Sequence, residues 1–135
     1  PAGGSLNQSS FETILNRENF MKMEGSTLFR IAIYSMVEAV EKILKRNNLK
    51  KEDISIVIPH QANLRIITGV AEKLGIPIEK FFINIEKYGN MSASCVPIAL
   101  DEAVREGRIK KGDLVITVAF GAGLTWGSNL IRWVK

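Results

Sequence analysis

Three short segments of the sequence combine side chains that donate hydrogen bonds with glycines that let a backbone come close to a substrate. They are Pro59–Asn63, Tyr88–Asn90 and Gly121–Gly123. The neutral imidazole of His60 can donate one hydrogen bond and can also transfer a proton. The side-chain amide of Asn90 can donate to an oxyanion as it develops. The sequence therefore contains groups suited to stabilising negative charge on an oxygen atom.

Each segment also has a structural interpretation. His60 is the only histidine, and a single histidine is more often structural than catalytic. Asn90 lies in a Gly-Asn pair, which is typical of a left-handed turn. Gly121 and Gly123 are typical of a tight hairpin, whereas the functional interpretation is a loop that brings a backbone amide to a reacting carbonyl. Spacing alone leaves both interpretations open.

Cys95 is the only cysteine, so an internal disulfide is excluded and a reducing cytoplasm suits the chain. It lies early in a predicted helix, where the helix N-terminus can lower the pKa of a thiol. Cysteine is nevertheless among the most buried residue types, which favours a structural role. A cysteine hydrolase would need Cys95 and His60 within hydrogen-bonding reach. Metal binding is disfavoured, and no glycine spacing matches a nucleotide-binding loop.

The elements that must position these segments alternate between helices and strands. Helices are expected from Ser26 to Arg46, from Gln61 to Leu74, and from the turn at Asn90 to about Glu106. Strands are expected over 54–58, 81–85, 114–120 and 124–134, the last one antiparallel. This order predicts an α/β fold with a mostly parallel sheet and helices packed on it. Because ligands bind beyond the carboxyl ends of such strands, the three segments should converge.

Composition limits the remaining possibilities. A chain of 135 residues with 46% hydrophobic residues suits one folded domain, and residues 1–25 are expected to be a loop or connecting segment. The net charge of +4 lacks the dense clustering that indicates nucleic-acid binding. No apolar run approaches about 18 residues, so no membrane span is expected. Without an initiator methionine or an opening strand, the sequence is expected to begin partway through a longer polypeptide.

Taken together, the segments resemble the motifs of 3-oxoacyl-[acyl-carrier-protein] synthase III. IPHQANLRII at 58–67 resembles the family's histidine motif, YGNMSAS at 88–94 its asparagine motif, and AFGAGLTWG at 119–127 its glycine-rich loop. The likeness runs from about residue 20 to the end. It implies a thiolase-like fold of two similar halves, of which residues 26–135 are the carboxyl-terminal catalytic half. The family's half opens with a strand that would precede Pro1.

The resemblance also implies an acyltransferase and the roles of individual residues. The family condenses an acyl group from coenzyme A with malonyl-acyl-carrier-protein, using a cysteine, a histidine and an asparagine. His60 and Asn90 match two of these, the cysteine belongs to the amino-terminal half, and Cys95 does not match it. The backbone amide of Ala122 matches an oxyanion hole. Two departures are Met91, where threonine is common, and Ala122, in a loop that is often three glycines.

Further positions match the family's binding surfaces. Asn63 resembles the residue that hydrogen-bonds the pantetheine arm, and Gly25 and Phe29 match positions that line its tunnel. The family's basic patch for acyl carrier protein is matched by Arg30, Arg65 and Lys73. No cofactor is implied, because the coenzyme A thioester is a substrate. The implied partners are acyl carrier protein, acyl-coenzyme A, the amino-terminal half and a second copy in a homodimer. The alternatives are a related thiolase-fold acyltransferase or polyketide priming synthase, and an inactive fragment without the nucleophile.

Overall fold

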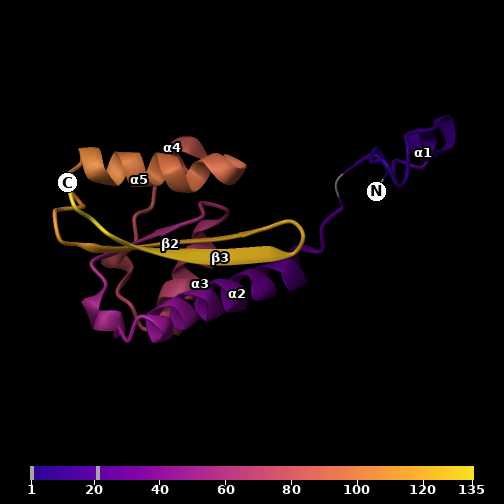
Figure 1. The fold of residues 1–135 in the computed structure, drawn as a ribbon. Coiled ribbons are helices and arrows are strands. Elements are labelled where there is room, and N and C mark those ends of the chain that lie inside the picture. The colour runs from indigo at the N-terminus through magenta and orange to yellow at the C-terminus, as the bar shows by residue number, and fades with distance from the viewer. Residues whose placement is uncertain (1, 21) are drawn as a thin grey trace.

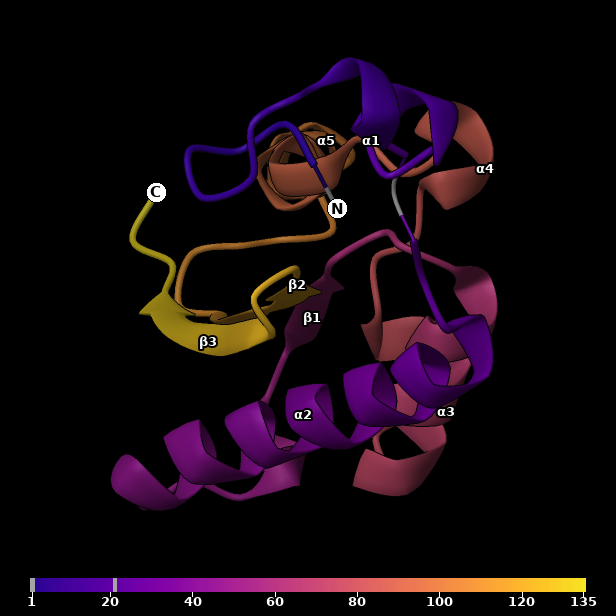
Figure 2. The ribbon, with the colours of Figure 1, turned by 90° about the vertical axis from the view of Figure 1, so that its right-hand side faces the viewer.

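The computed structural model describes residues 2–20 and 22–135 and shows a sheet between two layers of helices (Figures 1 and 2). Its helices and strands are α1 (Phe11–Leu15), α2 (Gly25–Arg46), β1 (Ile56–Pro59), α3 (Leu64–Leu74), α4 (Ile85–Tyr88), α5 (Cys95–Arg105), β2 (Leu114–Gly121) and β3 (Thr125–Arg132). Helices α2 and α3 cover one face of the sheet, and α5 with α4 lies over the other. The predicted α/β fold is confirmed.

The sheet has the order β1-β2-β3. Strands β1 and β2 are parallel, with Pro59 opposite Val118, and β2 and β3 are antiparallel, with Gly121 opposite Thr125. The predicted antiparallel last strand is therefore confirmed. Since β1 and β2 run in the same direction, the residues that follow them leave the sheet at the same edge. Those residues are the His60 segment and the loop around Ala122.

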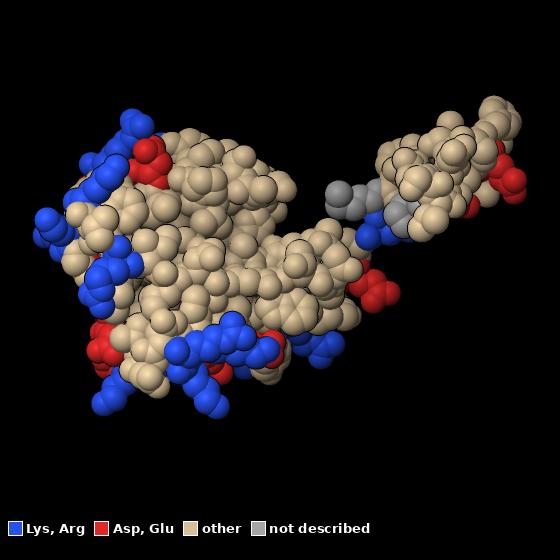
Figure 3. All heavy atoms as spheres, viewed as in Figure 1, with Lys and Arg blue, Asp and Glu red and all other residues tan. Residues whose placement is uncertain are grey.

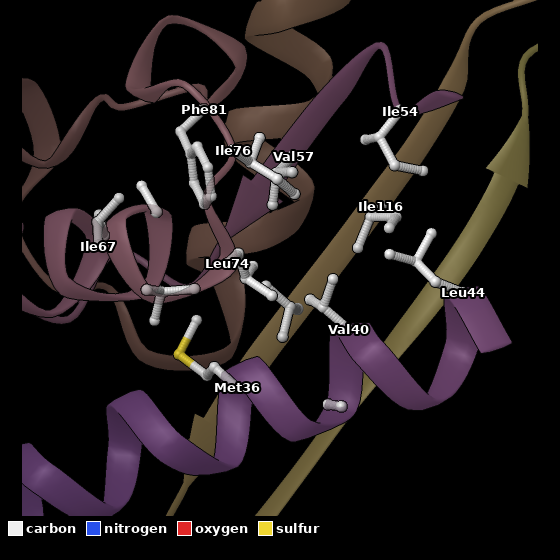
Figure 4. Close-up of a cluster of buried hydrophobic side chains, with 14 of the residues drawn as sticks. Met36, Val40, Leu44, Ile54, Val57, Ile67, Leu74, Ile76, Phe81 and Ile116 are labelled. Atoms are coloured by element: carbon white, nitrogen blue, oxygen red, sulfur yellow. The ribbon is translucent and has the colours of Figure 1, made fainter. Parts of the chain in front are cut away.

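The main core lies between the sheet and the pair α2 and α3. Figure 4 shows Met36 and Val40 of α2, Ile67 and Leu74 of α3, and Ile116 of β2 pointing into one cluster, and all five are almost fully buried. Burying such a side chain stabilises the fold by about 1.5–3 kcal/mol each. This layer fixes β1, and with it the position of His60.

The predicted strand over 81–85 is wrong. Only Phe81 forms a bridge, parallel to Val57, and Ile85–Tyr88 is the helical turn α4. The side chain of Gln61 explains the difference, because it bonds the carbonyl of Phe82 and the amide of Asn84. These are backbone groups that a neighbouring strand would otherwise bond.

The amino-terminal segment, predicted to be a loop over residues 1–25, contains the short helix α1 within its described part. Ser10 and Thr13 form a capping box at its start. The helix is not predicted because the apolar residues of this segment show no helical periodicity. In Figure 1 the segment that holds α1 projects away from the layered body. The third predicted helix begins with Cys95, which places Pro97 in its first turn, where proline is tolerated. Among the described residues, no helix is both long and apolar enough to cross a membrane.

Candidate active site

His60 is held at the carboxyl end of β1 by its backbone. Its amide donates to the carbonyl of Val118 on β2 at 2.8 Å, which continues the parallel ladder by one residue beyond Pro59. The side chain is half-buried, and burial lowers the pKa of the imidazole below its usual value. His60 is therefore a neutral imidazole at pH 7, as a proton-shuttling role requires.

The pKa of His60 can be measured directly. We expect its imidazole to titrate below the usual value of about 6.5 when followed by NMR, with a His60→Gln variant identifying the resonance. Between the folded and unfolded pKa values the unfolded chain binds more protons, so this group makes stability fall as the pH drops from about 6.5. A measured pKa of 6.5 or higher in the folded protein would contradict the expected effect of burial on this imidazole.

Gln61 joins the His60 segment to the chain that leads to Asn90. Its side chain is fully buried, and its amide nitrogen donates to the carbonyls of Pro59 at 2.9 Å and Phe82 at 3.1 Å. Its amide oxygen accepts from the backbone amide of Asn84 at 3.2 Å. The end of β1 is thus fastened to the segment that follows the Phe81 bridge.

The turn around Asn90 fixes the orientation of its amide. The oxygen accepts from the backbone amide of Ser92 at 3.0 Å and lies 3.8 Å from the Cys95 sulfur, which donates to it. The amide nitrogen makes no hydrogen bond within residues 2–20 and 22–135, and Asn90 is exposed. Because Gly89, not Asn90, has the positive φ of 70°, the left-handed interpretation applies to the glycine. Asn90 therefore presents two free N–H donors.

Cys95 is a buried structural residue. Its sulfur accepts from the backbone amide of Met91 at 3.0 Å and contacts the Asn90 oxygen, but the described residues show no hydrogen bond between it and His60. The alternative of a cysteine hydrolase lacks the contact on which it depended. Cys95 instead stabilises the asparagine turn through its contacts with Met91 and Asn90.

The loop between β2 and β3 is exposed to solvent. Ala122 lies between the paired ends Gly121 and Thr125 and is exposed. The positive φ of this loop falls on Gly123, at 150°, so Ala122 keeps a backbone conformation that tolerates its Cβ. The departure from three glycines is accommodated without strain at residue 122.

The residues predicted to bind pantetheine and carrier protein lie along α2 and α3. The guanidinium of Arg65 is 5.5 Å from the centre of the Phe29 ring, and the Lys73 ammonium is 4.4 Å from the ring of Tyr34. Asn63 caps α3, its oxygen accepting from the Arg65 amide at 2.9 Å. Gly25 is the first residue of α2, and Arg30 lines a shallow groove on its exposed side.

Charge is unevenly distributed over the surface. In Figure 3 lysine and arginine gather at the end of the body away from the β2–β3 turn and along the α2 layer. The surface over α5 toward that turn is almost entirely uncharged in the same view. On this face, therefore, most of the charged side chains lie away from the surface over α5.

The family follows from a match that covers most of the chain. Residues 44–133 match the family model described as 3-oxoacyl-[acyl-carrier-protein (ACP)] synthase III C terminal. The chain belongs to this family. The synthase III from Natranaerobius thermophilus is 51% identical over 98% of this chain, and that from Aquifex aeolicus is 50% identical over 93%. The chain spans 40% and 41% of the lengths of these synthases.

Solved structures of synthase III confirm the thiolase-like fold. The crystal structure of the Aquifex aeolicus enzyme matches 84% of this chain and 37% of its own, with a TM-score of 0.83 and 53% identity. The synthase III of Pseudomonas aeruginosa matches 88% of this chain and 38% of its own, with a TM-score of 0.84 and 39% identity.

Proposed function

We propose that this chain is the carboxyl-terminal catalytic part of an acyltransferase that initiates fatty-acid synthesis. The reaction is a decarboxylative Claisen condensation between an acyl group taken from coenzyme A and malonyl-acyl-carrier-protein. The main support is the Asn90 turn, whose amide is oriented with its oxygen occupied and its nitrogen free. Membership of the synthase III family supports the substrate class.

The chemistry requires an amino-terminal region that supplies the nucleophile. Its cysteine thiolate attacks the acyl-coenzyme A carbonyl, and the coenzyme A thiolate leaves. In malonyl-acyl-carrier-protein the bond to the carboxylate then breaks, carbon dioxide departs, and the bonding electrons form an enolate on the thioester. The enolate carbon attacks the acyl-cysteine carbonyl, and the cysteine thiolate is released. The isolated chain is expected to be inactive, because its only cysteine is buried.

His60 and Asn90 act on the enolate oxygen. Each donates one hydrogen bond to the negative charge that collects there, and a donor of this kind contributes about 3 kcal/mol to the transition state. The lowered pKa of His60 keeps the imidazole neutral, so it donates a hydrogen bond without carrying a full charge. The Ala122 amide, with the amide of the nucleophilic cysteine, stabilises the oxyanion of the acyl-cysteine.

The complete enzyme is this chain joined to the amino-terminal region of its family. Its activity is tested by two assays, transfer of the acyl group from coenzyme A to the cysteine and release of carbon dioxide from malonyl-acyl-carrier-protein. We expect both in the unaltered complete enzyme. An enzyme that transfers the acyl group but never releases carbon dioxide would overturn the proposal.

Docking of acyl carrier protein is proposed for the exposed cations of α2 and α3. Carrier proteins are acidic, so Arg30, Arg65 and Lys73 would steer the encounter, with pantetheine passing Gly25, Phe29 and Asn63. We expect Arg65→Glu to raise the KM for malonyl-acyl-carrier-protein about tenfold and to make it less sensitive to salt. The KM for acyl-coenzyme A should change less.

Arg105→Glu is the matched control for this prediction. Arg105 is also exposed, but it belongs to α5 on the opposite layer and pairs with Asp101. The same change of charge there should leave the KM for the carrier-linked substrate unchanged. Equal effects of the two substitutions would show that net charge, not a docking surface on α3, controls the encounter.

A polyketide priming ketosynthase is the second candidate. The priming β-ketosynthase of the R1128 polyketide pathway matches 94% of this chain and 40% of its own, with a TM-score of 0.79 and 31% identity. The rival would share the catalytic residues but not the docking patch of Arg30, Arg65 and Lys73. Ready use of malonyl-coenzyme A in place of the carrier-linked form would instead indicate a carrier-independent acyltransferase. We also propose that the complete enzyme assembles with a second copy of itself as a homodimer.

A further inference from the structure

Glu102 of α5 collects hydrogen bonds from the segment that immediately precedes Asn90. Its side chain is only 12% exposed. The carboxylate accepts from Asn84 Nδ2 at 2.8 Å and from the Tyr88 hydroxyl at 3.2 Å, and it also pairs with the Lys87 ammonium. All three donors lie within six residues of Asn90. One carboxylate therefore anchors the short helix α4, which leads directly into the asparagine turn.

The same network reaches the His60 segment. Asn84, which donates its side chain to Glu102, also donates its backbone amide to Gln61, the residue next to His60. Asn84 and Gln61 are both buried, at 7% and 0% exposed. A continuous series of hydrogen bonds thus runs from the residue after His60, through Asn84 and Glu102, to the helix that ends just before Asn90.

We propose that Glu102 is a positioning residue that sets the place of Asn90 relative to His60. This inference rests on the proposed function, because it assigns to the network the spacing of the two donors to one enolate oxygen. The physical requirement is strict, since a displacement of about 1 Å in a catalytic group can lower a rate about 100-fold. Asn90 lies on an exposed turn between α4 and α5, so its distance from His60 depends on what holds α4 as well as on the contact with Cys95.

The chemistry of the pair suits this role. The hydrogen bond from Lys87 lowers the pKa of Glu102, and the same contact raises the pKa of Lys87 to about 12. Both groups are therefore charged near neutral pH, and hydrogen bonds between charged groups are stronger than neutral ones. Lys87 also balances the negative charge of the carboxylate.

The orientation of Asn84 is fixed by the same arrangement. Its side-chain oxygen is buried without a partner in the described residues, while its nitrogen faces the carboxylate. Turning the amide over would bring an oxygen against Glu102 and lose the bond. The Asn84 side chain can therefore donate to Glu102 in one orientation only, while its backbone amide bonds Gln61.

The test uses Glu102→Gln in the complete enzyme. The substitution keeps the shape of the side chain but removes its negative charge and replaces one acceptor oxygen by a donor. The ion pair with Lys87 is lost, and Asn84 keeps a bond to residue 102 only by turning its amide over. We expect the rate of decarboxylation to fall at least tenfold, while the rate of acyl transfer to the cysteine stays within twofold. The KM values for acyl-coenzyme A and malonyl-acyl-carrier-protein should be unchanged. Tyr88→Phe removes one exposed donor and should lower decarboxylation about twofold to threefold with the fold intact.

Asp101→Asn is the matched control. Asp101 is the neighbouring acid on the same helix, but it is exposed and pairs with Arg105. The same chemical change there should leave both steps unaltered. If Asp101→Asn lowers decarboxylation as much as Glu102→Gln does, the effect belongs to α5 as a whole and the positioning role is overturned.

A double-mutant cycle with Asn90→Ala separates positioning from general stability. A residue that acts through Asn90 should have little further effect once the Asn90 amide is gone, so the combined loss should match Asn90→Ala alone. Multiplicative losses, or equal losses in both steps, would overturn the positioning role while the proposed function stands. Absence of decarboxylation in the unaltered complete enzyme would overturn the proposed function, and the positioning role with it.

Discussion

Asn90→Asp is expected to lower malonyl decarboxylation by the complete enzyme about 1000-fold or more. Aspartate has the same shape as asparagine and keeps the oxygen that accepts from Ser92 and Cys95, so the turn should persist. The free amide nitrogen becomes a carboxylate oxygen. One donor is lost, which costs about 100- to 1000-fold, and a negative charge then faces the enolate oxygen. Acyl transfer to the cysteine should stay within a fewfold of the original rate.

Two further variants make this result specific. Asn90→Ala removes the donor without adding a charge, so its loss should be smaller than that of Asn90→Asp. Asn19→Asp makes the same chemical change at an exposed position before α2 and should alter neither step. Equal rates of decarboxylation in Asn90→Ala and Asn90→Asp would contradict a negative charge developing beside this residue. The two steps are best measured separately, as carbon dioxide release and acyl-enzyme formation.

The elements that local patterns specify are predicted well. Apolar residues at helical spacing mark the buried face of α2, and the β-branched run marks β1, which is buried at all its positions. The hairpin of β2 and β3 follows from two strands around a glycine loop. In each case the neighbours along the chain carry the signal. The His60 segment and the glycine loop can be located for the same reason, since each comes at or just after a strand end, whereas the Asn90 segment follows the helical turn α4.

The rest depends on contacts between distant parts of the chain. Residues 81–85 look like a strand, but the buried amide of Gln61 takes the backbone bonds that would extend it. Glu102 resembles any charged residue on an amphipathic helix until α5 is placed against α4. The only local hint is polar residues, Gln61 and Asn84, beside apolar runs that have to be buried. The hydrophobic periodicity and the composition of the sequence do not show which group a buried polar residue hydrogen-bonds.

Removing the imidazole is the second change with a large expected effect. His60→Ala should lower decarboxylation about 100- to 1000-fold, because it deletes one of the two donors to the enolate oxygen. Backbone bonding of residue 60 to Val118 does not involve the side chain, so the end of β1 should keep its place. Acyl transfer should continue at nearly its original rate, since we propose that backbone amides, not His60, stabilise the oxyanion of that step.

His60→Asn distinguishes a hydrogen-bond donor from a proton shuttle. Asparagine retains an N–H donor but cannot take up a proton near neutral pH. If donation is the main role, this variant should recover a substantial part of the activity lost in His60→Ala. If decarboxylation is equally low in both, the proton-transfer capacity of the neutral imidazole carries the step instead. Equal loss of acyl transfer and decarboxylation in His60→Ala would remove His60 from the enolate site, because a donor to that oxygen has no part in the first step.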